Sequence, residues 1–404
     1  MEDKTNSSNK QEIKDVKNDN NINKNSKKEP LETPKKKTQK AKEKKKLKIY
    51  EKIIIVLAIL FVLGSSIVVF LLYGPWGGFR DWLITTAMST LNHQYLATWF
   101  YSDATIQECL NRNRIVEVSG TTDENAIEII DYEEQEEEII YANEYERQIL
   151  EKDKDNNDYK IIKIDGKNYD GYMAVIYDPS RIEVATSSAL GSSGQYLTDI
   201  SKRNNALVAI NAGGFADENY QGSGGSALGV TISKGKTLSS KGYSGSNGII
   251  GFNNDNKLIL GKYSASQAQN NGIRDCVTFG PTLILNGQSS QIYGNGGWGT
   301  APRTAIGQRA DGIVLFLVLD GNRTLGQGAT IKDLIEIFER YGAINASNLD
   351  GGTSTSMTVK GKTINDPTNL SGAHNTRPIP TAFILKSDDS DDGDYSVVKN
   401  KVNK

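Results

Sequence analysis

An uninterrupted apolar run constrains this chain more than any other feature. No charged residue occurs in residues 53–79, and residues 53–73 read IIIVLAILFVLGSSIVVFLLY. As a helix, this stretch would be about 31 Å long, which is enough to cross the hydrocarbon core of a bilayer. A core helix of a soluble protein is rarely apolar on every face over such a length. The run therefore predicts a transmembrane helix, assigned to residues 51–74.

The flanks of this span indicate its orientation. Nine lysines lie in residues 34–48, directly before the span, whereas residues 74–79 on the other side are uncharged. Lysine-rich flanks stay in the cytoplasm, so we expect a cytoplasmic amino terminus and an extracellular carboxyl-terminal part. The basic and apolar segments are both too long for a cleaved signal peptide. The sequence thus predicts a single-pass protein of the cell membrane.

Composition divides the rest of the chain. Residues 1–50 contain sixteen lysines and eight acidic residues, and they are predicted to be disordered because they cannot bury enough apolar surface. Residues 75–158 predict a juxtamembrane helical stalk followed by an acidic, solvated linker or extended helix. The polar residues 388–404 are again predicted to be disordered. The part after the span has 30 basic and 40 acidic residues, which argues against a nucleic-acid partner.

Residues 159–387 have the pattern of a folded domain made of short strands. Apolar runs alternate with glycine- and asparagine-containing turns, and the run at 312–320 is apolar at successive positions, as in a strand buried on both faces. Lys-Gly pairs predict hairpins at 231–238 and 358–365. A helix is predicted over 330–342, with a capping residue at its start and a glycine at its end. We predict an α+β fold with mixed, largely antiparallel sheets and a few packed helices.

Cysteine and histidine are too scarce for most metal centres. The chain has Cys109 and Cys276, and His93 and His374, and no pair has the spacing of zinc ligands. A disulfide is chemically allowed outside the cell, and whether the two cysteines pair is left open. We expect no required cofactor. A structural divalent cation such as Ca²⁺ near the Asp and Asn side chains of residues 215–221 or 252–258 is left open, because turn formation explains those residues as well.

Four clusters of turn-forming residues follow predicted strands. They are Asn211-Ala212-Gly213-Gly214-Phe215, APRTAIG at 301–307, Asp320-Gly321-Asn322 and Asp350-Gly351-Gly352-Thr353-Ser354. Each cluster alone is explained by ordinary turn chemistry or by a surface arginine. The fourth cluster offers a carboxylate, glycine amides and hydroxyls together, which are groups that receive charged or sugar-like ligands.

Together, the clusters resemble the phosphodiester glycosidase family, which contains N-acetylglucosamine-1-phosphodiester α-N-acetylglucosaminidase. The matching stretches are APRTAIG (301–307), VLDGNRTLGQGATIKDLIEIF (318–338), NASNLDGGTSTSMTVKGKTINDP (345–367) and TRPIPTAFIL (376–385), and VAINAGGF (208–215) is similar to the family's amino-terminal motif. The resemblance covers residues 170–386 in the family's motif order. One departure is Thr353, which stands where the family has a third glycine and adds a Cβ close to the expected ligand.

The resemblance implies hydrolysis of a sugar-1-phosphodiester, such as a GlcNAc-1-phosphate linkage, at the glycosidic bond. Such a site needs cationic or amide donors for the phosphate and a carboxylate for oxocarbenium-like charge or for water. We predict Asp350 and Asp320 as the catalytic carboxylates, and Arg303 and Arg377 as bidentate phosphate clamps. The other predicted substrate-binding residues are Asn211, Gly213, Gly214, Gly351, Gly352, Thr353, Ser354 and His374. A solvent-facing loop position explains His374 equally well.

The membrane tether and the resemblance together predict an extracytoplasmic hydrolase acting on a glycan or sugar-phosphate polymer of the cell envelope, or on an exopolysaccharide. The alternative is a membrane-anchored glycan-binding or polysaccharide-assembly protein that keeps the fold without turnover. A serine hydrolase is disfavoured, because His374 is the one histidine in the domain and no Gly-x-Ser-x-Gly elbow occurs.

Overall fold

The computed structural model describes residues 47–90, 93–130, 140–216, 223–241, 248–321, 327–366 and 376–388, together with the backbone of 397–400. Contacts divide the chain into two units, residues 1–62 and residues 63–404. All of the sheets lie in the second unit. The predicted amino-terminal tail lies, up to residue 46, outside the described residues.

Eight α-helices are present among the described residues. They are α1 (Ile49–Tyr73), α2 (Gly77–Met88), α3 (Tyr95–Thr98), α4 (Asp103–Arg112), α5 (Glu144–Leu150), α6 (Leu197–Arg203), α7 (Ala265–Asn270) and α8 (Ile331–Arg340). Helix α1 is long and apolar enough to cross a membrane, and none of its most apolar stretch is buried. The apolar run therefore forms one continuous helix, as its sequence predicts.

The described strands form three larger sheets and one small ribbon. The eight-stranded sheet has the order β12 (Gln288–Ser289), β11 (Thr282–Leu285), β16 (Ala343–Asn348), β14 (Arg303–Arg309), β15 (Val314–Asp320), β3 (Asp170–Ile176), β2 (Tyr159–Asp165), β20 (Val397–Asn400). One five-stranded sheet has the order β18 (Lys362–Thr363), β17 (Met357–Val359), β5 (Ala206–Asn211), β19 (Thr381–Lys386), β4 (Ile182–Thr186). The other has the order β7 (Lys236–Lys241), β6 (Gly229–Ser233), β10 (Ile273–Phe279), β8 (Gly248–Asn253), β9 (Leu258–Gly261), and β1 (Arg114–Val116) pairs with β13 (Gln291–Tyr293).

Strand pairing confirms the predicted α+β fold with largely antiparallel sheets. Among the described strands, only β2 and β20 pair in parallel. The backbone of β20 therefore adopts a strand within residues 388–404, where the sequence predicts disorder. The β6–β7 and β17–β18 connections are the predicted hairpins, with Lys234-Gly235 at φ 51° and 72° and Lys360-Gly361 at φ 47° and 72°. These left-handed pairs match the right-handed twist of the strands that they join.

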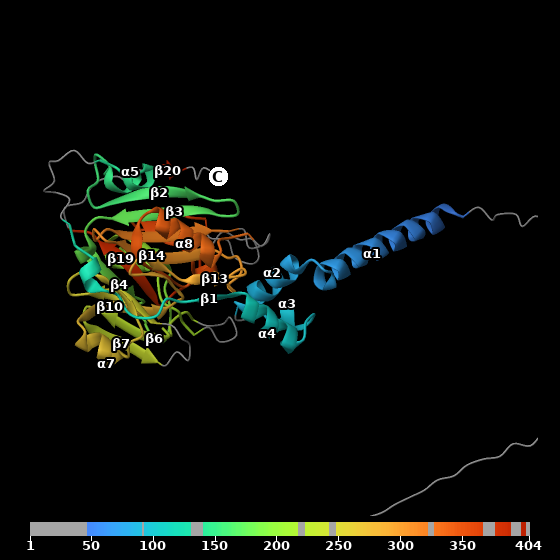
Figure 1. Cartoon of the computed structure of the whole chain (residues 1–404), viewed down its shortest axis with the longest axis horizontal. Helices are drawn as coiled ribbons and strands as arrows, with labels where there is room; N and C mark the ends of the chain where they lie inside the picture. The colour runs from blue at the N-terminus through green and yellow to red at the C-terminus, as the bar shows by residue number, and fades with distance from the viewer. Residues whose placement is uncertain are drawn as a thin grey trace, which may run out of the picture. The chain divides into compact units, whose positions relative to one another are not determined.

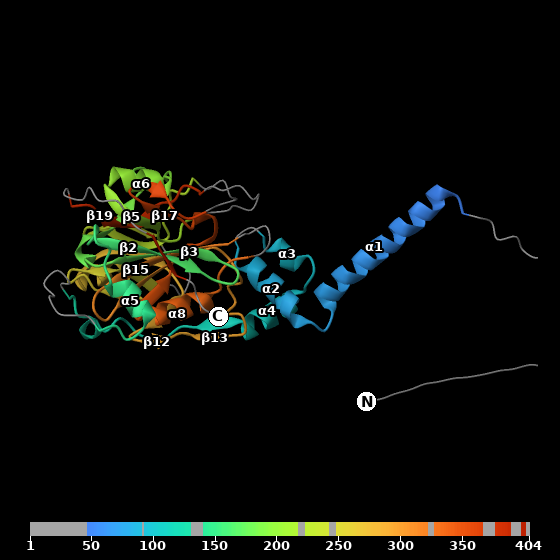
Figure 2. The same cartoon turned by 90° about the horizontal axis from the view of Figure 1, so that it is seen from above.

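Strand β15 is buried on both faces because it lies between two apolar cores. Its residues Val314, Phe316 and Val318 belong to the core shared with β5, β19 and β8. The alternate residues Leu315, Leu317 and Leu319 pack with α8 instead. Figure 2 shows the resulting layers, in which α6, the sheet of β5 and β17, the sheet of β3 and β15, and α8 follow one another. The continuous apolar pattern of the strand thus reflects cores on both of its sides.

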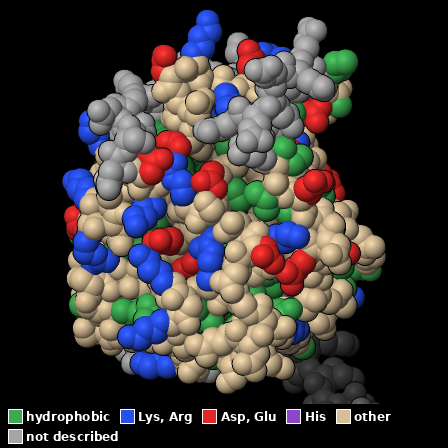
Figure 3. Space-filling model, turned by 90° about the vertical axis from the view of Figure 1, so that its left-hand side faces the viewer, with side chains coloured by type: hydrophobic (Ala, Val, Ile, Leu, Met, Phe, Trp, Pro, Cys, Tyr) green, Lys and Arg blue, Asp and Glu red, His purple; other side chains and the backbone are tan. Residues whose placement is uncertain are grey.

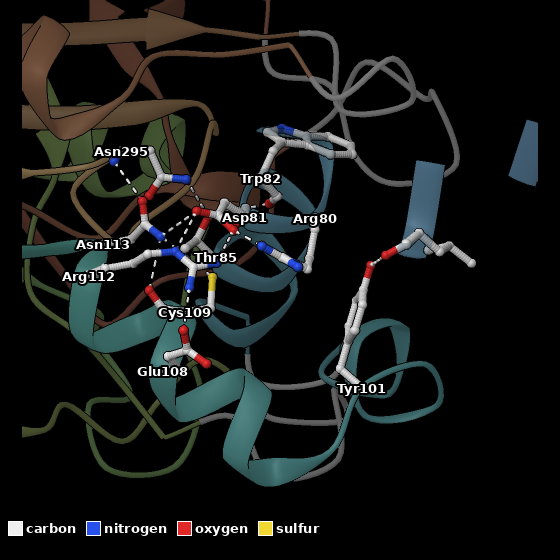
Figure 4. Close-up of polar contacts among 11 residues, drawn as sticks. Arg80, Asp81, Trp82, Thr85, Tyr101, Glu108, Cys109, Arg112, Asn113 and Asn295 are labelled. Carbon is white, nitrogen blue, oxygen red and sulfur yellow. Dashed lines mark hydrogen bonds and ion pairs between the residues drawn. The ribbon is translucent and has the colours of Figure 1, made fainter. Parts of the chain in front are cut away.

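Helices α2–α4 form a compact helical unit with a charged hub. Asp81 accepts hydrogen bonds from Arg112 Nη2 and Nε at 2.6 and 3.0 Å and from Asn113 Nδ2 at 2.9 Å (Figure 4). Burial would raise the pKa of Asp81, but the hydrogen bonds from Arg112 and Asn113 and the Arg112 charge outweigh it and lower the pKa to about 2. An apolar cluster that includes Ile84 and Ile106 completes this unit.

The helical unit packs against the sheets, whereas the sequence predicts a stalk. Trp82 Nε1 donates to Thr300 Oγ1 at 3.1 Å, and Asn295 Nδ2 donates to Thr85 Oγ1 at 2.9 Å. Asn113 Oδ1 also accepts from the backbone N–H of Asn295 at 2.9 Å. Since β1 pairs with β13, residues well before 159 contribute to the structure of the predicted domain (Figure 1).

The acidic stretch 122–158 also packs against the sheets in its described parts. Ile127 and Ile149 are buried, and the Ile149 carbonyl accepts a hydrogen bond from Tyr177 OH at 2.9 Å. Tyr341 OH donates to Gln148 Oε1 at 3.0 Å. The sequence predicts a solvated linker or extended helix here, but the isolated apolar side chains between the acids are sufficient to attach it. Residues 131–139 lie outside the described residues.

Cys109 and Cys276 are both free and buried. They lie in separate apolar clusters, one in the helical unit and one beside β10. Burial raises the pKa of Cys109 to about 11 and that of Cys276 to about 12. The structure therefore settles the open question of pairing: the two thiols form no disulfide with each other.

Figure 3 shows one face of the molecule with its side chains coloured by type. Lysine and arginine side chains are interspersed there with aspartate and glutamate side chains. Among the described residues drawn on this face, neither sign of charge forms a continuous patch.

Candidate active site

Asn211 connects three of the four predicted clusters. It ends β5, and its side chain is 1% exposed. Its Nδ2 donates to the Asp350 carbonyl at 2.5 Å, while its Oδ1 accepts from Thr304 Oγ1 at 2.7 Å and from the Ser356 N–H at 3.0 Å. Segments that are far apart in sequence therefore meet at this one amide. The structure assigns Asn211 to holding these segments together, and direct contact with a substrate stays a prediction.

The Asp350 loop is fixed on both sides by backbone hydrogen bonds. The Asp350 N–H donates to the Ala212 carbonyl at 2.9 Å, and the Gly352 N–H donates to the Pro302 carbonyl at 2.9 Å. Asp350 itself is half-buried. A pre-positioned carboxylate is what a glycosidase site requires.

Thr353 fits this loop without backbone strain. The left-handed position in the loop is Gly352, with φ 66°, and Thr353 is absent from the residues with positive φ among those described. Residues Gly352–Ser354 form one turn of 3₁₀-helix in which the Ser354 N–H donates to the Gly351 carbonyl at 3.2 Å. The Cβ that distinguishes this chain from the family pattern is therefore tolerated locally.

Asp320 is a buried carboxyl group at the end of β15. It is 6% exposed, and it accepts hydrogen bonds from Asn365 Nδ2 at 2.7 Å and from the Asp366 N–H at 2.8 Å. Burial raises the pKa of Asp320 to about 6, partly offset by these two hydrogen bonds and increased slightly by the charges of Asp170 and Asp366. A carboxyl group that titrates near neutral pH is suited to acid or base catalysis.

Asp320 and the Asp350 loop belong to one hydrogen-bond network. Asn365 Nδ2, which donates to Asp320, also donates to the Thr355 carbonyl at 3.3 Å. Thr355 is followed by Ser356, whose N–H donates to Asn211, the residue that holds the Asp350 carbonyl. The Asp320 carboxylate is thus linked to the backbone of Asp350 through a short chain of buried amides.

A cavity of about 470 Å³ opens beside Asp320. It is lined by the β2–β3 turn, the end of β15 and two further segments: Asp165, Gly166, Lys167, Asn168, Tyr169, Asp170, Asp320, Gly321, Gln327 and Asp366. Carboxylates, amides and one aromatic ring are groups that bind sugar hydroxyls and a sugar ring face. Lys167 is the one basic residue of this lining, so the cavity suits a neutral sugar better than a phosphate.

Three of the predicted glycine donors bind protein groups instead. The N–H of Gly213 donates to Thr381 Oγ1 at 3.0 Å, that of Gly214 to the Thr278 carbonyl at 3.2 Å, and that of Gly352 to Pro302. These three N–H groups therefore have acceptors within the protein, and a role for these glycines in binding substrate stays a prediction. The glycines at 213 and 214 are needed for packing, since a Cβ there would lie 2.9 Å from Val277 Cβ and 3.0 Å from Phe279 Cδ2. A role for Gly351 and Ser354 in binding stays a prediction.

Arg303 is buried at the start of β14 and is 4% exposed. Its Nε donates to the Ala329 carbonyl at 3.1 Å, and its Nη2 donates to the carbonyls of Trp298 and Gly299 at 2.7 and 3.1 Å. The structure assigns Arg303 to holding the glycine-rich loop 294–299, which packs on α2. A phosphate clamp at this position stays a prediction.

Arg377 lies with its guanidinium 4.5 Å from the centroid of the Phe215 ring. It is half-buried, and this cation–π contact places it beside the first cluster. Its role as a phosphate clamp stays a prediction. His374 and Asn322 lie outside the described residues, so the proposed contact of His374 with substrate is not placed by the structure.

Among the described residues, no group of three or more His, Cys, Asp or Glu side chains has an arrangement that could hold a metal ion. In residues 252–258, Asn253 Oδ1 accepts from the N–H groups of Asp255 and Lys257 at 3.0 and 2.9 Å, which is turn formation. Residues 217–221 of the other candidate stretch lie outside the described residues.

Sequence reasoning missed several residues of the cavity. Asp366 lies in a stretch that resembles the family, but in sequence it looks like the end of a hairpin. Asp165 and Asp170 flank the β2–β3 turn in a region without a motif. The sequence contains only a weak signal for these two residues. Asp165 lies five residues before Asp170, a spacing that fits the two ends of a hairpin turn. Only the pairing of β3 with β15, with Asp170 opposite Asp320, brings them to the site.

The contact between α2 and the loop 294–299 predicts a large cost for a side chain at Gly299. Gly299 has φ 57°, and a Cβ there would lie 2.4 Å from Thr86 Oγ1 and 2.7 Å from Thr86 Cα. We expect Gly299→Ala to lower the free energy of unfolding by about 2–4 kcal/mol, through backbone strain plus overlap. Urea unfolding of the purified chain, followed by tryptophan fluorescence, measures this.

Gly287→Ala is the matched control, because Gly287 also has positive φ, 76°, but no atom lies within 4 Å of the position that a Cβ would take there. It should cost only about 1 kcal/mol, from strain alone. Equal effects of the two substitutions would show that α2 does not pack closely on this loop.

Comparison with known proteins matches the part of the chain that contains this candidate site. Residues 204–386, a little under half of the chain, match the family model described as phosphodiester glycosidase. They include β5, β14, β15 and the Asp350 loop, the elements that build the site. The chain therefore carries a domain that matches the phosphodiester glycosidase family.

The individual proteins to which this chain is similar have low sequence identity to it. The SPbeta prophage-derived uncharacterized protein YomE of Bacillus subtilis is 28% identical over 257 residues, which cover 60% of this chain and 38% of that protein. The chain thus spans well under half of that relative's length. The catalytic domain of zebrafish N-acetylglucosamine-1-phosphodiester α-N-acetylglucosaminidase, auto-inhibited by its pro-peptide, has 21% identity and a TM-score of 0.48, covering 57% of this chain and 83% of that chain. A hypothetical protein from Synechocystis has 20% identity and a TM-score of 0.38, covering 56% of this chain and 61% of that chain.

Proposed function

We propose that this protein hydrolyses a sugar-1-phosphodiester, of the GlcNAc-1-phosphate type, at the glycosidic bond. The observation that carries the proposal is Asp320, a buried carboxyl group with a pKa near 6 that lines a sugar-sized cavity and is linked by amides to the Asp350 loop. The sugar occupies the cavity, where Asp165, Asn168 and Gln327 bind its hydroxyls. The phosphate points away from the carboxylates that line the cavity.

The two carboxylates divide the chemistry. A phosphomonoester is a good leaving group, so it departs from the anomeric carbon with little need for protonation. Asp350 stabilises the oxocarbenium-like charge that develops as this C–O bond breaks. The Asp320 carboxylate accepts the proton of the water whose oxygen bonds to the anomeric carbon. The products are a free sugar and a phosphomonoester.

The substrate lies outside the cell in this proposal. Helix α1 is the anchor, the lysine-rich residues before it remain in the cytoplasm, and the domain faces the envelope. A tethered domain meets surface glycans first, so we propose a sugar-phosphate polymer of the envelope or an exopolysaccharide as the natural substrate.

A synthetic GlcNAc-1-phosphodiester incubated with the purified chain tests the proposal. We expect equal amounts of free sugar and phosphomonoester from the native protein. Asp350→Asn should slow release by at least about 10²-fold, because it removes the charge that stabilises the transition state. Asp255→Asn, an exposed turn aspartate, is the control and should keep the native rate. Binding of the compound without release by any of the three proteins would favour the non-catalytic glycan-binding alternative.

A further inference from the structure

Large apolar side chains are exposed where α1 ends and α3 begins. Six residues with exposed fractions between 36% and 73% make up this patch, which we name the aromatic foot: Tyr73, Trp76, Tyr95, Leu96, Trp99 and Phe100. Four of the six lie within or directly after α3. The described residues 93–101 contain no lysine, arginine, aspartate or glutamate. Such a concentration of exposed rings indicates a binding surface.

Two tyrosines fix the foot to the last turn of α1. Tyr73 OH donates to the Phe100 carbonyl at 3.0 Å. Tyr101, labelled in Figure 4, donates its OH to the Leu72 carbonyl at 3.0 Å. The rings of Tyr73 and Tyr101 also meet edge to face, with centroids 6.0 Å apart. Leu72, Ala97 and Tyr101 belong to one buried cluster. The foot is therefore packed on the end of α1.

The chemistry of the foot matches the interface between lipid and water. Tryptophan and tyrosine concentrate at the headgroup level of membranes, where their apolar rings are buried and their N–H and O–H groups remain hydrated. The foot begins at the residue where the proposed span ends, so its surface is continuous with the lipid-facing surface of α1. We propose that the aromatic foot is a second membrane contact, seated in the headgroup layer on the side of the membrane that faces the domain.

This inference rests on the proposed role of α1 as a span, and it adds a consequence. The foot is joined to α2. Helix α2 forms hydrogen bonds with Thr300 and Asn295, in and beside the loop that Arg303 holds. A foot seated in the lipid therefore sets the distance and orientation of the site relative to the membrane, whereas a span alone would leave the domain free to rotate.

Nitroxide labels on the full chain in phosphatidylcholine–phosphatidylglycerol vesicles test the foot. Single cysteines are introduced at Trp99 in the foot, at Ile67 in α1, and at Leu238, an exposed apolar residue on β7. Leu96→Cys adds a foot label that keeps every aromatic ring. The native chain is the labelling blank, because Cys109 and Cys276 are buried.

We expect the labels at Ile67, Trp99 and Leu96 to be accessible to oxygen and shielded from a water-soluble nickel complex, with Ile67 the deepest. The label at Leu238 should show the opposite pattern. If both foot labels behave like Leu238 while Ile67 stays in lipid, the foot is wrong and the span stands. If Ile67 is also exposed to the nickel complex, the span is wrong, and the foot proposal falls with it.

Discussion

Asp320→Asn is expected to lower kcat/KM on a sugar-1-phosphodiester by about 10²- to 10⁴-fold, the usual contribution of a positioned acid–base group. The amide nearly matches the carboxylate in size, but it cannot accept a proton from water. The buried position at the end of β15 gives the side chain little freedom to move away. Initial rates of sugar release by the native chain and the variant measure the effect.

The pH dependence gives the direction of the proton transfer. The pKa of Asp320 is raised to about 6, so the group is protonated below that pH and cannot act as a base. We expect kcat/KM to rise about tenfold per pH unit below pH 6 and to level off above it. Activity that instead falls as the pH rises through 6 would make Asp320 a general acid and would overturn the assigned role.

Removing the neighbouring charge of Asp170 tests the role of Asp320 more specifically than a loss of activity does. Asp170 lies opposite Asp320 on β3, and its charge helps to raise the pKa of Asp320. Asp170→Asn should therefore move the acidic limb of the profile to lower pH. An unchanged limb would mean that another group controls the profile. Asp255→Asn, which is remote from the cavity, should leave both the rate and the profile unchanged.

The elements that the sequence predicts well depend on neighbours in the chain. The hairpin turns require a left-handed pair, and Lys234-Gly235 and Lys360-Gly361 adopt one. Helix α8 has its capping box, because Thr330 Oγ1 accepts from the Asp333 N–H, and its buried face includes Leu334. Local rules suffice for such features.

The roles of polar residues in the site depend on distant partners, and there the sequence is less informative. A glycine that receives a ligand and a glycine that packs against a neighbouring ring look alike in sequence, and only the structure shows Phe279 beside Gly214. The sequence likewise does not show that the Arg303 guanidinium donates to the carbonyls of Trp298 and Gly299. Strand register decides both, and register is not evident from composition.

The helical segment after α1 shows the same limit. Its apolar recurrence predicts helices, and they are present. The apolar recurrence does not show which surface these helices pack against. Trp82 and Thr85 form hydrogen bonds with Thr300 and Asn295, which lie more than two hundred positions later. The prediction of a juxtamembrane helical stalk followed from reading the segment alone.

Asn211→Ala is expected to be the most destabilising single change at the site. The substitution removes a buried amide that serves the Asp350 carbonyl, Thr304 Oγ1 and the Ser356 N–H, and it leaves those groups without this partner. Unsatisfied buried polar groups cost about 1–3 kcal/mol each, so we expect a loss of about 3–5 kcal/mol and a Tm lower by roughly 10 °C. Thermal unfolding followed by circular dichroism measures it.

Two matched variants distinguish the loss of the hydrogen bonds of Asn211 from the general effect of removing an asparagine side chain. Thr304→Val removes one of the three bonds with little change of shape and should cost about 1 kcal/mol. Asn271→Ala removes an exposed amide that bonds only within its own helix end, to the Gln267 carbonyl, and should change the stability by less than about 0.5 kcal/mol. If Asn211→Ala behaves like Asn271→Ala, the three segments are held by their backbone contacts alone. The Asp350 loop would then keep its place without the amide, and the site would owe its geometry to the strands rather than to Asn211.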